Sequence, residues 1–254
     1  MKCLNYLLLI FVLGFISCNE DSLEIDTTQD TYQDDIADIT FVNDHFYSTN
    51  YDLSGNAGSQ IDLLKFSSDG KNIDDSFDLG MNGQGYLAIT NDGTDVYLQS
   101  INTSLIIKRS LIGERIYMSL DNLSGSQWQG SGLCYKKDAD SLLVLYKNLK
   151  NPIQFRARTV SKQYPNNSGS DIIFDIDSVG TVNKGVYAIE YFDSSFYMLG
   201  INRSGKNILF ISDYNFNSFS IEEIPDSTVI GLCFKGNDLF FSYSDRIIKK
   251  WKSY

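Results

Sequence analysis

The feature that most constrains the fold of this 254-residue chain is a pattern that occurs five times. Each occurrence has an apolar run, a short polar turn and a second run in which apolar and polar residues alternate. The segments span residues 38–52, 85–102, 132–148, 185–202 and 231–245. Asn, Asp, Gly and Ser fill the turns, and these residues favour tight reversals between antiparallel strands. We therefore expect five hairpins, with equivalent positions for four glycines: Gly85, Gly132, Gly185 and Gly231.

Further strands are predicted after each hairpin. A third strand is expected at residues 61–66, 105–108, 153–156, 208–211 and 246–251. A fourth, more polar strand is expected in the first four units, at residues 74–79, 116–120, 171–176 and 219–224. No long window in this part keeps the i, i+3, i+4 apolar spacing of an amphipathic helix. The body of the chain is therefore predicted to be all-β.

The spacing of the units indicates how these strands are arranged. Four strands per unit, repeated every 46–53 residues, are typical of propeller blades. We therefore predict a five-bladed β-propeller of four-stranded blades. A six-bladed ring is an alternative, but the repeats leave little room for another blade of about 40 residues. A β-sandwich is a second alternative, and it does not explain glycines at equivalent positions.

The fifth unit ends at Tyr254 after only three strands. An open sheet edge invites pairing with other chains, so a propeller needs its ring closed. Residues 22–27 alternate between polar and apolar and are predicted to supply the missing outer strand. The expected organisation is a signal peptide at 1–17, a tether with the closing strand at 18–37, and the propeller domain at 38–254.

The first residues have the pattern of an export signal. Lys2 precedes an apolar run at residues 7–16, and the small residue Ser17 stands before Cys18. The run is shorter than the about 20 residues that a membrane-spanning helix needs. Residues 15–18 resemble the lipobox of bacterial lipoproteins, in which the cysteine becomes the lipidated first residue. This resemblance implies lipidation at Cys18 and a membrane-bound lipid anchor.

The residues after Cys18 bear on localisation. Asn19, Glu20 and Asp21 resemble the acidic signal that sends lipoproteins of Bacteroidota-type bacteria to the outer face of the outer membrane. The resemblance implies a surface-exposed, lipid-anchored protein of the outer membrane; the alternative is its periplasmic face. Together with the repeat, the chain resembles lipid-anchored bacterial propeller proteins in general.

Charge limits the classes of partner. Removal of residues 1–17 takes away Lys2 and no acidic residue, so the formal charge changes from −11 to −12. An acidic body without a basic stripe repels phosphate backbones, and nucleic acid is therefore not an expected partner. The membrane is expected as a partner through the lipid anchor alone.

Few residues are suited to metal or nucleophilic chemistry. His45 is the single histidine, and no Cys and His cluster has the spacing of a zinc site. Cys134 and Cys233 occupy the same place in units three and five, which are not adjacent in a five-bladed ring. A disulfide needs Cα atoms about 4.4–6.8 Å apart, so we predict two buried free thiols. We expect neither a metal site nor a cofactor.

The loops that enter the inner strands are the expected place for a ligand. In propellers that this chain resembles, ligands meet the face built from such loops. The loop at 80–84 contains Asn82 and Gln84, and the loop at 124–131 contains Gln127, Trp128 and Gln129. An exposed Trp between two amides is suited to stack on a sugar ring while the amides bond its hydroxyls. The other interpretation is that Trp128 packs between blades, because Trp is well buried on average.

Three classes of function follow. The first is a cell-surface binding module that captures a glycan or another ligand through these loops. The alternative is a protein–protein scaffold that binds a partner in the outer membrane. A glycoside hydrolase is less favoured, because it needs two carboxylates about 5 to 9.5 Å apart. Glu190 and Asp38 are the only acids that the predicted inner strands offer, so no catalytic residue is predicted.

Overall fold

The structure, a computed structural model, describes residues 35–51, 60–82, 86–100, 105–111, 115–119, 127–163, 168–176 and 186–254. These residues form five antiparallel sheets, each built from consecutive strands. Blade one contains β1 (Asp35–Val42), β2 (His45–Tyr51), β3 (Gln60–Phe66) and β4 (Ile73–Asn82). Blade two contains β5 (Tyr86–Asn91), β6 (Asp95–Ser100), β7 (Leu105–Ser110) and β8 (Arg115–Ser119). Blade three contains β9 (Trp128–Lys136), β10 (Ser141–Asn148), β11 (Gln154–Ser161) and β12 (Ser168–Asp175).

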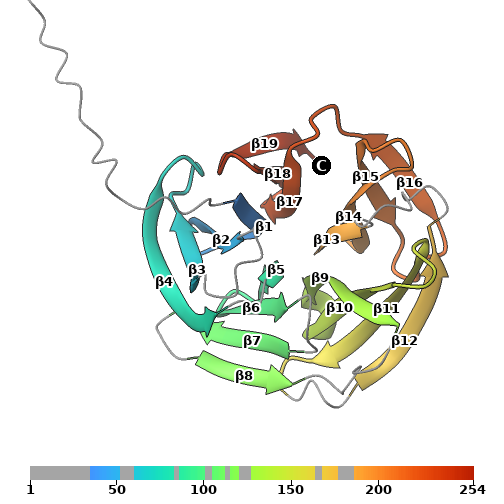
Figure 1. Cartoon of the computed structure of the whole chain (residues 1–254), viewed down its shortest axis with the longest axis horizontal. Helices are drawn as coiled ribbons and strands as arrows, with labels where there is room; N and C mark the ends of the chain where they lie inside the picture. The colour runs from blue at the N-terminus through green and yellow to red at the C-terminus, as the bar shows by residue number, and fades with distance from the viewer. Residues whose placement is uncertain are drawn as a thin grey trace, which may run out of the picture. The chain divides into compact units, whose positions relative to one another are not determined.

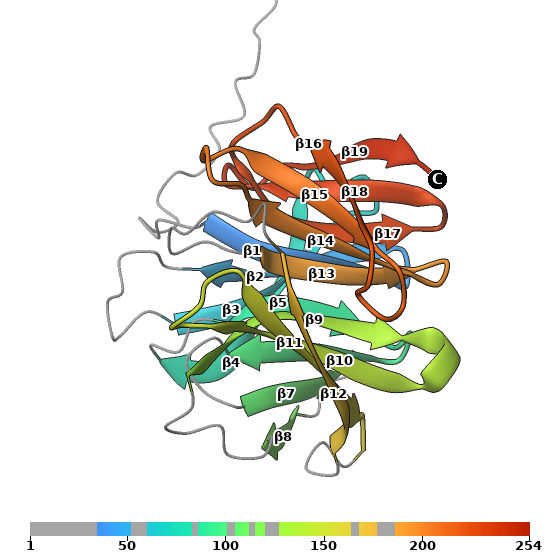
Figure 2. The same ribbon diagram turned by 90° about the vertical axis from the view of Figure 1, so that its right-hand side faces the viewer.

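The last two blades complete the ring. Blade four contains β13 (Val186–Phe192), β14 (Ser195–Ile201), β15 (Asn207–Ser212) and β16 (Phe219–Glu223). Blade five contains β17 (Val229–Lys235), β18 (Asp238–Tyr243) and β19 (Ile248–Ser253). Figure 1 shows the sheets around a common centre, with β1, β5, β9, β13 and β17 innermost, and Figure 2 shows the same ring from the side. Each inner strand contacts the next in this order, and β17 contacts β1.

The predicted fold is therefore confirmed: this part of the chain is an all-β, five-bladed propeller. A β-sandwich is excluded by the ring of five sheets, and the described residues contain no sixth blade. The predicted closing strand at 22–27 and the predicted boundary at 17 lie outside the described residues. The predicted boundary between residues 37 and 38 falls inside β1, which begins at Asp35. The described part of the chain contains no helix with the length and hydrophobicity needed to cross a membrane.

Tight turns join the first and second strands of each blade. Asn43 and Asp44 have φ of 50° and 62°, and Asp193 and Ser194 have φ of 45° and 61°. Two successive residues with positive φ match the right-handed twist of the flanking strands, and Asn and Asp tolerate this conformation. Blade three instead has a short 3₁₀ turn at Lys137–Ala139. The predicted turn positions are thus confirmed in their chemistry and their place.

Every inner strand carries an irregularity in its pairing near its beginning. The register with the second strand shifts between Tyr86 and Ala88, between Val186 and Ala188, and at the corresponding places in the other blades. Such β-bulges bend a strand and increase its local twist. Counting from the hairpin turns, five residues follow the bulge at the same place: Asp38, Ala88, Gly132, Ala188 and Gly231.

This register corrects the expected alignment of the four glycines. Gly132 and Gly231 are equivalent, but Gly85 and Gly185 precede Ala88 and Ala188 by three residues and lie outside the described residues. The error arose because turn lengths differ between blades and the bulges leave no mark in the sequence. In blades three and five the position needs a small residue because neighbouring inner strands approach closely there: a Cβ on Gly132 would lie 2.7 Å from the Cγ2 atom of Ile189.

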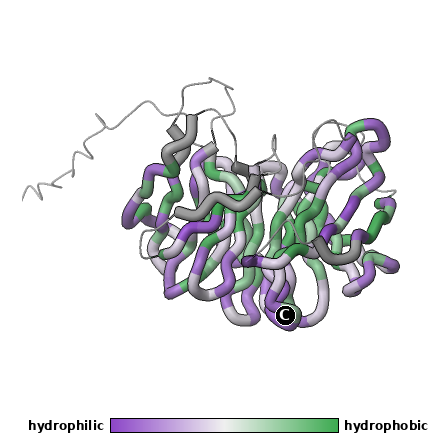
Figure 3. Tube along the Cα trace, turned by 90° about the horizontal axis from the view of Figure 1, so that it is seen from below, coloured by the Kyte–Doolittle hydropathy of each residue, from purple (hydrophilic) through white to green (hydrophobic). Residues whose placement is uncertain are grey.

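The core lies between the blades. Five clusters of buried hydrophobic residues fill the five spaces between adjacent blades. Figure 3 shows hydrophobic residues along the middle of the strands and hydrophilic residues at many of the turns. Such a core holds the backbone of each blade rigidly, so side chains at the two edges of the ring have fixed positions.

Candidate functional sites

The edge of the ring at which the inner strands begin is called the entry edge here. The second strand of each blade ends at this edge and the third begins there, because neighbouring strands are antiparallel. Trp128 is the first residue of β9 and pairs with Asn148 at the end of β10. The strand therefore begins earlier than expected, and Trp128 and Gln129 belong to it rather than to a loop. Gln127 precedes the strand, and its carbonyl accepts a hydrogen bond of 2.7 Å from the N–H of Leu149.

Trp128 lies between the two environments expected for it. Its side chain is half-buried and packs against the hydrophobic cluster between blades two and three, which contains Tyr97 and Tyr146. The guanidinium of Arg156 lies 5.9 Å from the centre of the indole ring. Gln127 and Gln129 are also half-buried. The indole is thus held in place by its packing and still reaches the surface at the entry edge.

Two arginines beside Trp128 share one carboxylate. Arg156 and Arg158 stand on β11, and both donate to Asp171 on β12. The Nε atom of Arg158 lies 2.8 Å from the Oδ1 atom of Asp171. Burial raises the pKa of Asp171, but hydrogen bonds from Arg158 and Arg156 outweigh burial and hold this pKa below its usual range. The carboxylate is therefore ionised at neutral pH, and the three side chains carry one net positive charge.

Several buried polar atoms near Trp128 have no hydrogen-bond partner in the described part of the protein. They are the Nε atom of Arg156, the hydroxyl of Tyr146, and both side-chain polar atoms of Gln99. Gln99 and Tyr146 are each 2% exposed. Native structures leave few buried polar groups unpaired, so such a group needs an explanation. Nothing in the sequence pattern indicated these three residues, because the proximity of Arg156 and Tyr146 depends on the register of β10 and β11, and that of Gln99 on how blades two and three pack.

Asn82 and Gln84 are the other two residues predicted at the entry edge. Asn82 ends β4 and pairs with Gln60. Gln84 lies outside the described residues. On β9, Trp128 and Gln129 are successive residues and therefore point to opposite faces of the sheet.

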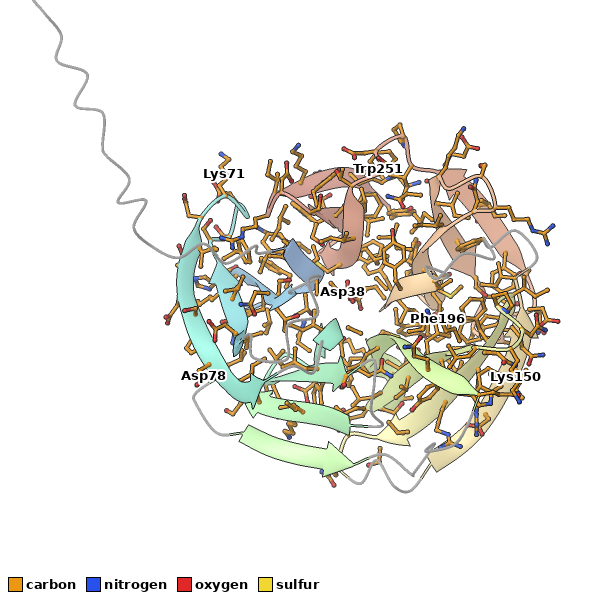
Figure 4. The ribbon with its side chains drawn as sticks, viewed as in Figure 1. Asp38, Lys71, Asp78, Lys150, Phe196 and Trp251 are labelled. Atoms are coloured by element: carbon orange, nitrogen blue, oxygen red, sulfur yellow. The ribbon has the colours of Figure 1, made fainter. Side chains whose placement is uncertain are left out.

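Asp38 lies at the inner end of blade one, where the inner strands converge (Figure 4). It occupies the place where the other blades have Gly or Ala, and it is 1% exposed. Its Oδ1 atom accepts hydrogen bonds from the N–H of Ile39, at 3.0 Å, and from that of Leu232 in blade five, at 3.1 Å. Its Oδ2 atom has no partner among the described residues. The Asp38 carboxyl therefore joins the first blade to the last.

Glu190 on β13 is the second carboxyl group in this central region. Burial raises the pKa of Glu190 to about 8, although a hydrogen bond from the backbone N–H of Tyr191 to the Glu190 carboxyl opposes the shift. Burial also raises the pKa of Asp38, and backbone hydrogen bonds from Leu232 and Ile39 oppose that shift. The charge of Glu190 raises the pKa of Asp38 further. The charge of Glu190 thus reaches Asp38 across the middle of the ring.

This geometry does not favour hydrolysis. A glycoside hydrolase needs two carboxyl groups that both reach the scissile bond. Asp38 is enclosed and its Oδ1 atom is held by two backbone N–H groups, one from each side of the seam between blades five and one. We therefore interpret Asp38 as a structural group.

The cysteines and the single histidine are the remaining residues that the sequence analysis considered for chemistry. Cys134 and Cys233 are buried and free, as predicted, and burial raises the pKa of both thiols well above the usual value. His45 begins β2, and its Nδ1 atom lies 2.7 Å from the carbonyl oxygen of Asn43. Within the described ranges, no three His, Cys, Asp or Glu residues are grouped so that they can hold a metal ion. Cys18, the predicted lipidation site, lies outside the described residues.

Comparisons with known proteins agree on the architecture. No family model and no curated protein matches the chain. The glutaminyl cyclase of Myxococcus xanthus is similar in structure, with a TM-score of 0.60 and 11% identity over 86% of this chain and 90% of that one. An α-L-arabinofuranosidase from Clostridium thermocellum has a TM-score of 0.60 and 13% identity over 83% of this chain and 81% of that one. The endosialidase of phage phi92 has a TM-score of 0.57 and 9% identity over 82% of this chain and 50% of that one. At these identities the likeness shows the propeller fold alone.

Proposed function

We propose that this protein is a lipid-anchored binding module that captures a polysaccharide at the entry edge of blade three. Trp128 is the observation that carries the proposal. Its indole is fixed by packing between two blades and reaches the surface, and Gln127 and Gln129 precede and follow it in the chain. Binding sites combine a rigid apolar surface with a few polar groups that fix the orientation of the ligand. The face of a sugar ring is apolar and its rim carries hydroxyls, so it matches this arrangement.

The sequence supports the cellular part of the proposal. The export pattern ends at Cys18, and a lipidated cysteine anchors the chain to a membrane. The acidic residues that follow favour the outer face of the outer membrane, with the periplasmic face as the alternative. The acidic body adds no attraction to anionic lipid. We propose that the propeller is held at a membrane surface while its entry edge binds a glycan.

The test is affinity electrophoresis of the full-length protein, in mild detergent, through gels that contain a panel of neutral and acidic polysaccharides. We expect at least one polymer to retard the parent. Trp128→Ala removes the indole and is expected to abolish the retardation. Trp128→Leu keeps apolar volume against the cluster but removes the flat ring, and it serves if the alanine variant is unstable.

Trp251 supplies a matched control because it is the second Trp of the chain, is also half-buried, and lies in blade five. Trp251→Phe is expected to keep the retardation. Far-ultraviolet circular dichroism checks the fold of each variant. Absence of retardation in every gel overturns the glycan proposal. Co-purification with a single membrane protein then favours the alternative, a protein–protein scaffold.

A further inference from the structure

The local charge beside Trp128 is positive, whereas the protein as a whole is acidic. The chain has a formal charge of −11, but Arg156, Arg158 and Asp171 together carry one net positive charge. The side chains of Arg156 and Arg158 are 16% and 11% exposed. A partly buried charge is screened by solvent and salt much less than an exposed one. This small positive site is therefore suited to attract an anionic group locally, despite the acidic body.

Strand pairing brings the unpartnered polar groups to the same place. Tyr146 on β10 is paired with Arg156 on one side and with Gly130 on the other. A Cβ on Gly130 would lie 2.8 Å from the Nε2 atom of Gln99, so the amide of Gln99 lies against Gly130 from blade two. Trp128 stands two residues before Gly130 and shares its face of β9. These side chains thus form one cluster between blades two and three.

The chemistry of the cluster is rich in unused donors. The Nε atom of Arg156, the hydroxyl of Tyr146 and the Nε2 atom of Gln99 donate hydrogen bonds, and none has an acceptor within the described part of the chain. Burial raises the pKa of Tyr146 above its usual value, so its hydroxyl keeps its proton and stays a donor. A carboxylate offers about four acceptor sites on two oxygens and pairs well with a guanidinium. It is the group that best matches these three donors.

We propose that this cluster recognises a carboxylate-bearing sugar residue, so that the ligand is an acidic polysaccharide. The inference rests on the proposed function and names its ligand class. The sugar ring lies on Trp128, and the carboxylate pairs with Arg156, which reaches the surface beside the indole. Tyr146 is paired with Arg156, Gln99 lies against Gly130, and both offer donors to the same carboxylate. Arg158 retains Asp171 when Arg156 turns toward the ligand.

The experiment compares uronate polymers with their carboxyl-reduced forms. Polygalacturonate, alginate and hyaluronan are the probes, and reduction turns each into a neutral polymer of the same linkage. Dissociation constants are measured for full-length protein in mild detergent. We expect at least one acidic polymer to bind at least tenfold more tightly than its reduced form. We also expect its affinity to fall as the salt concentration rises, because the contact is electrostatic.

Arg156→Gln tests the residue assigned to the carboxylate. It is expected to weaken binding of the acidic polymer at least tenfold and to leave binding of the reduced form unchanged. Arg156→Lys keeps the charge but loses the planar fork, and an intermediate affinity is expected. Arg203→Gln is the matched control, since Arg203 is an exposed arginine in a turn of blade four, and it is expected to have no effect. Circular dichroism confirms that each variant is folded.

The outcomes separate the inference from the function on which it rests. Equal affinity for acidic and reduced polymers overturns the inference and leaves glycan binding intact. An unchanged affinity in Arg156→Gln also overturns it, and indicates that ordered water alone satisfies the buried donors. Failure of every polymer, acidic or neutral, to bind overturns the proposed function itself.

Discussion

Gly231 is the residue at which the packing of the ring is tested most sharply. It stands on β17 at the seam between blades five and one. A Cβ at this position would lie 2.5 Å from the Cα atom of Asp38 and 2.8 Å from its Oδ1 atom. Real Cβ atoms do not approach a backbone atom this closely, so β17 and β1 must separate in Gly231→Ala. The backbone itself is not strained by the substitution, because φ of Gly231 lies outside the left-handed region.

Two contributions determine how far Gly231→Ala lowers the free energy of unfolding. Overpacking a rigid site costs about 1–3 kcal/mol. Separation of the strands also lengthens the 3.1 Å hydrogen bond from the N–H of Leu232 to Asp38. Because burial raises the pKa of Asp38 and favours its neutral form, we use the contribution of an uncharged hydrogen bond, about 0.5–1.5 kcal/mol. Together they predict that the free energy of unfolding falls by about 1.5–4.5 kcal/mol, a substantial part of the about 5–15 kcal/mol typical of a folded domain.

The assay is urea unfolding of the full-length protein in mild detergent, followed by circular dichroism. Gly236→Ala is the matched control in the same blade. Its φ is +61° and its Cβ would meet no atom within 4 Å, so only the left-handed backbone is penalised, by about 1–2 kcal/mol. A loss in Gly231→Ala no larger than that in Gly236→Ala would refute the close approach of β17 and β1.

Two further predictions concern the centre of the ring. Glu190 has a folded-state pKa of about 8, above its ordinary value of 4.5, so the folded protein holds a proton that the unfolded chain releases between these values. Its contribution is therefore most favourable below pH 4.5 and is lost as the pH rises toward 8. Glu190→Gln is expected to remove this loss, so the thermal midpoint of the variant relative to the parent should increase between pH 5 and 8.5. The exposed Glu223→Gln is the control, and a constant difference in Glu190→Gln would contradict the argument. Cys134 and Cys233 are buried, and burial keeps their thiols mainly protonated. A thiol reagent is therefore expected to label them only at the rate at which the protein unfolds. Rapid labelling in native buffer would contradict their burial.

The ring and its blade boundaries were predictable because they depend on local signals. Apolar runs and polar turns recur in the chain. The same repeat showed that Cys134 and Cys233 occupy equivalent positions in blades three and five. Strand ends were less accurate: β11 extends to Ser161 although only residues 153–156 were expected. The end of this strand was not predicted because it contains polar and charged residues such as Arg158. The burial of these residues depends on the packing of the blades and not on the local sequence.

The glycine alignment and the surroundings of Trp128 were beyond the sequence for a related reason. Both depend on contacts between blades, and a pattern within one repeat contains no information about them. The bulges that place Asp38 opposite Gly231 insert residues without any change of composition. Arg156 reaches Trp128 from β11 of the same blade, whereas Gln99 on β6 reaches the neighbouring Gly130 only because blades two and three pack together.

The most direct test of the central claim is the fluorescence of Trp128 itself. The chain has two Trp residues, so Trp251→Phe leaves Trp128 as the sole indole. The variant is titrated, as full-length protein in mild detergent, with each polysaccharide of the panel. We expect a saturable change in emission with at least one polymer, because a sugar ring on the indole removes water from its face. Binding of a polymer that leaves the emission of Trp128 unchanged would contradict the assignment of the site.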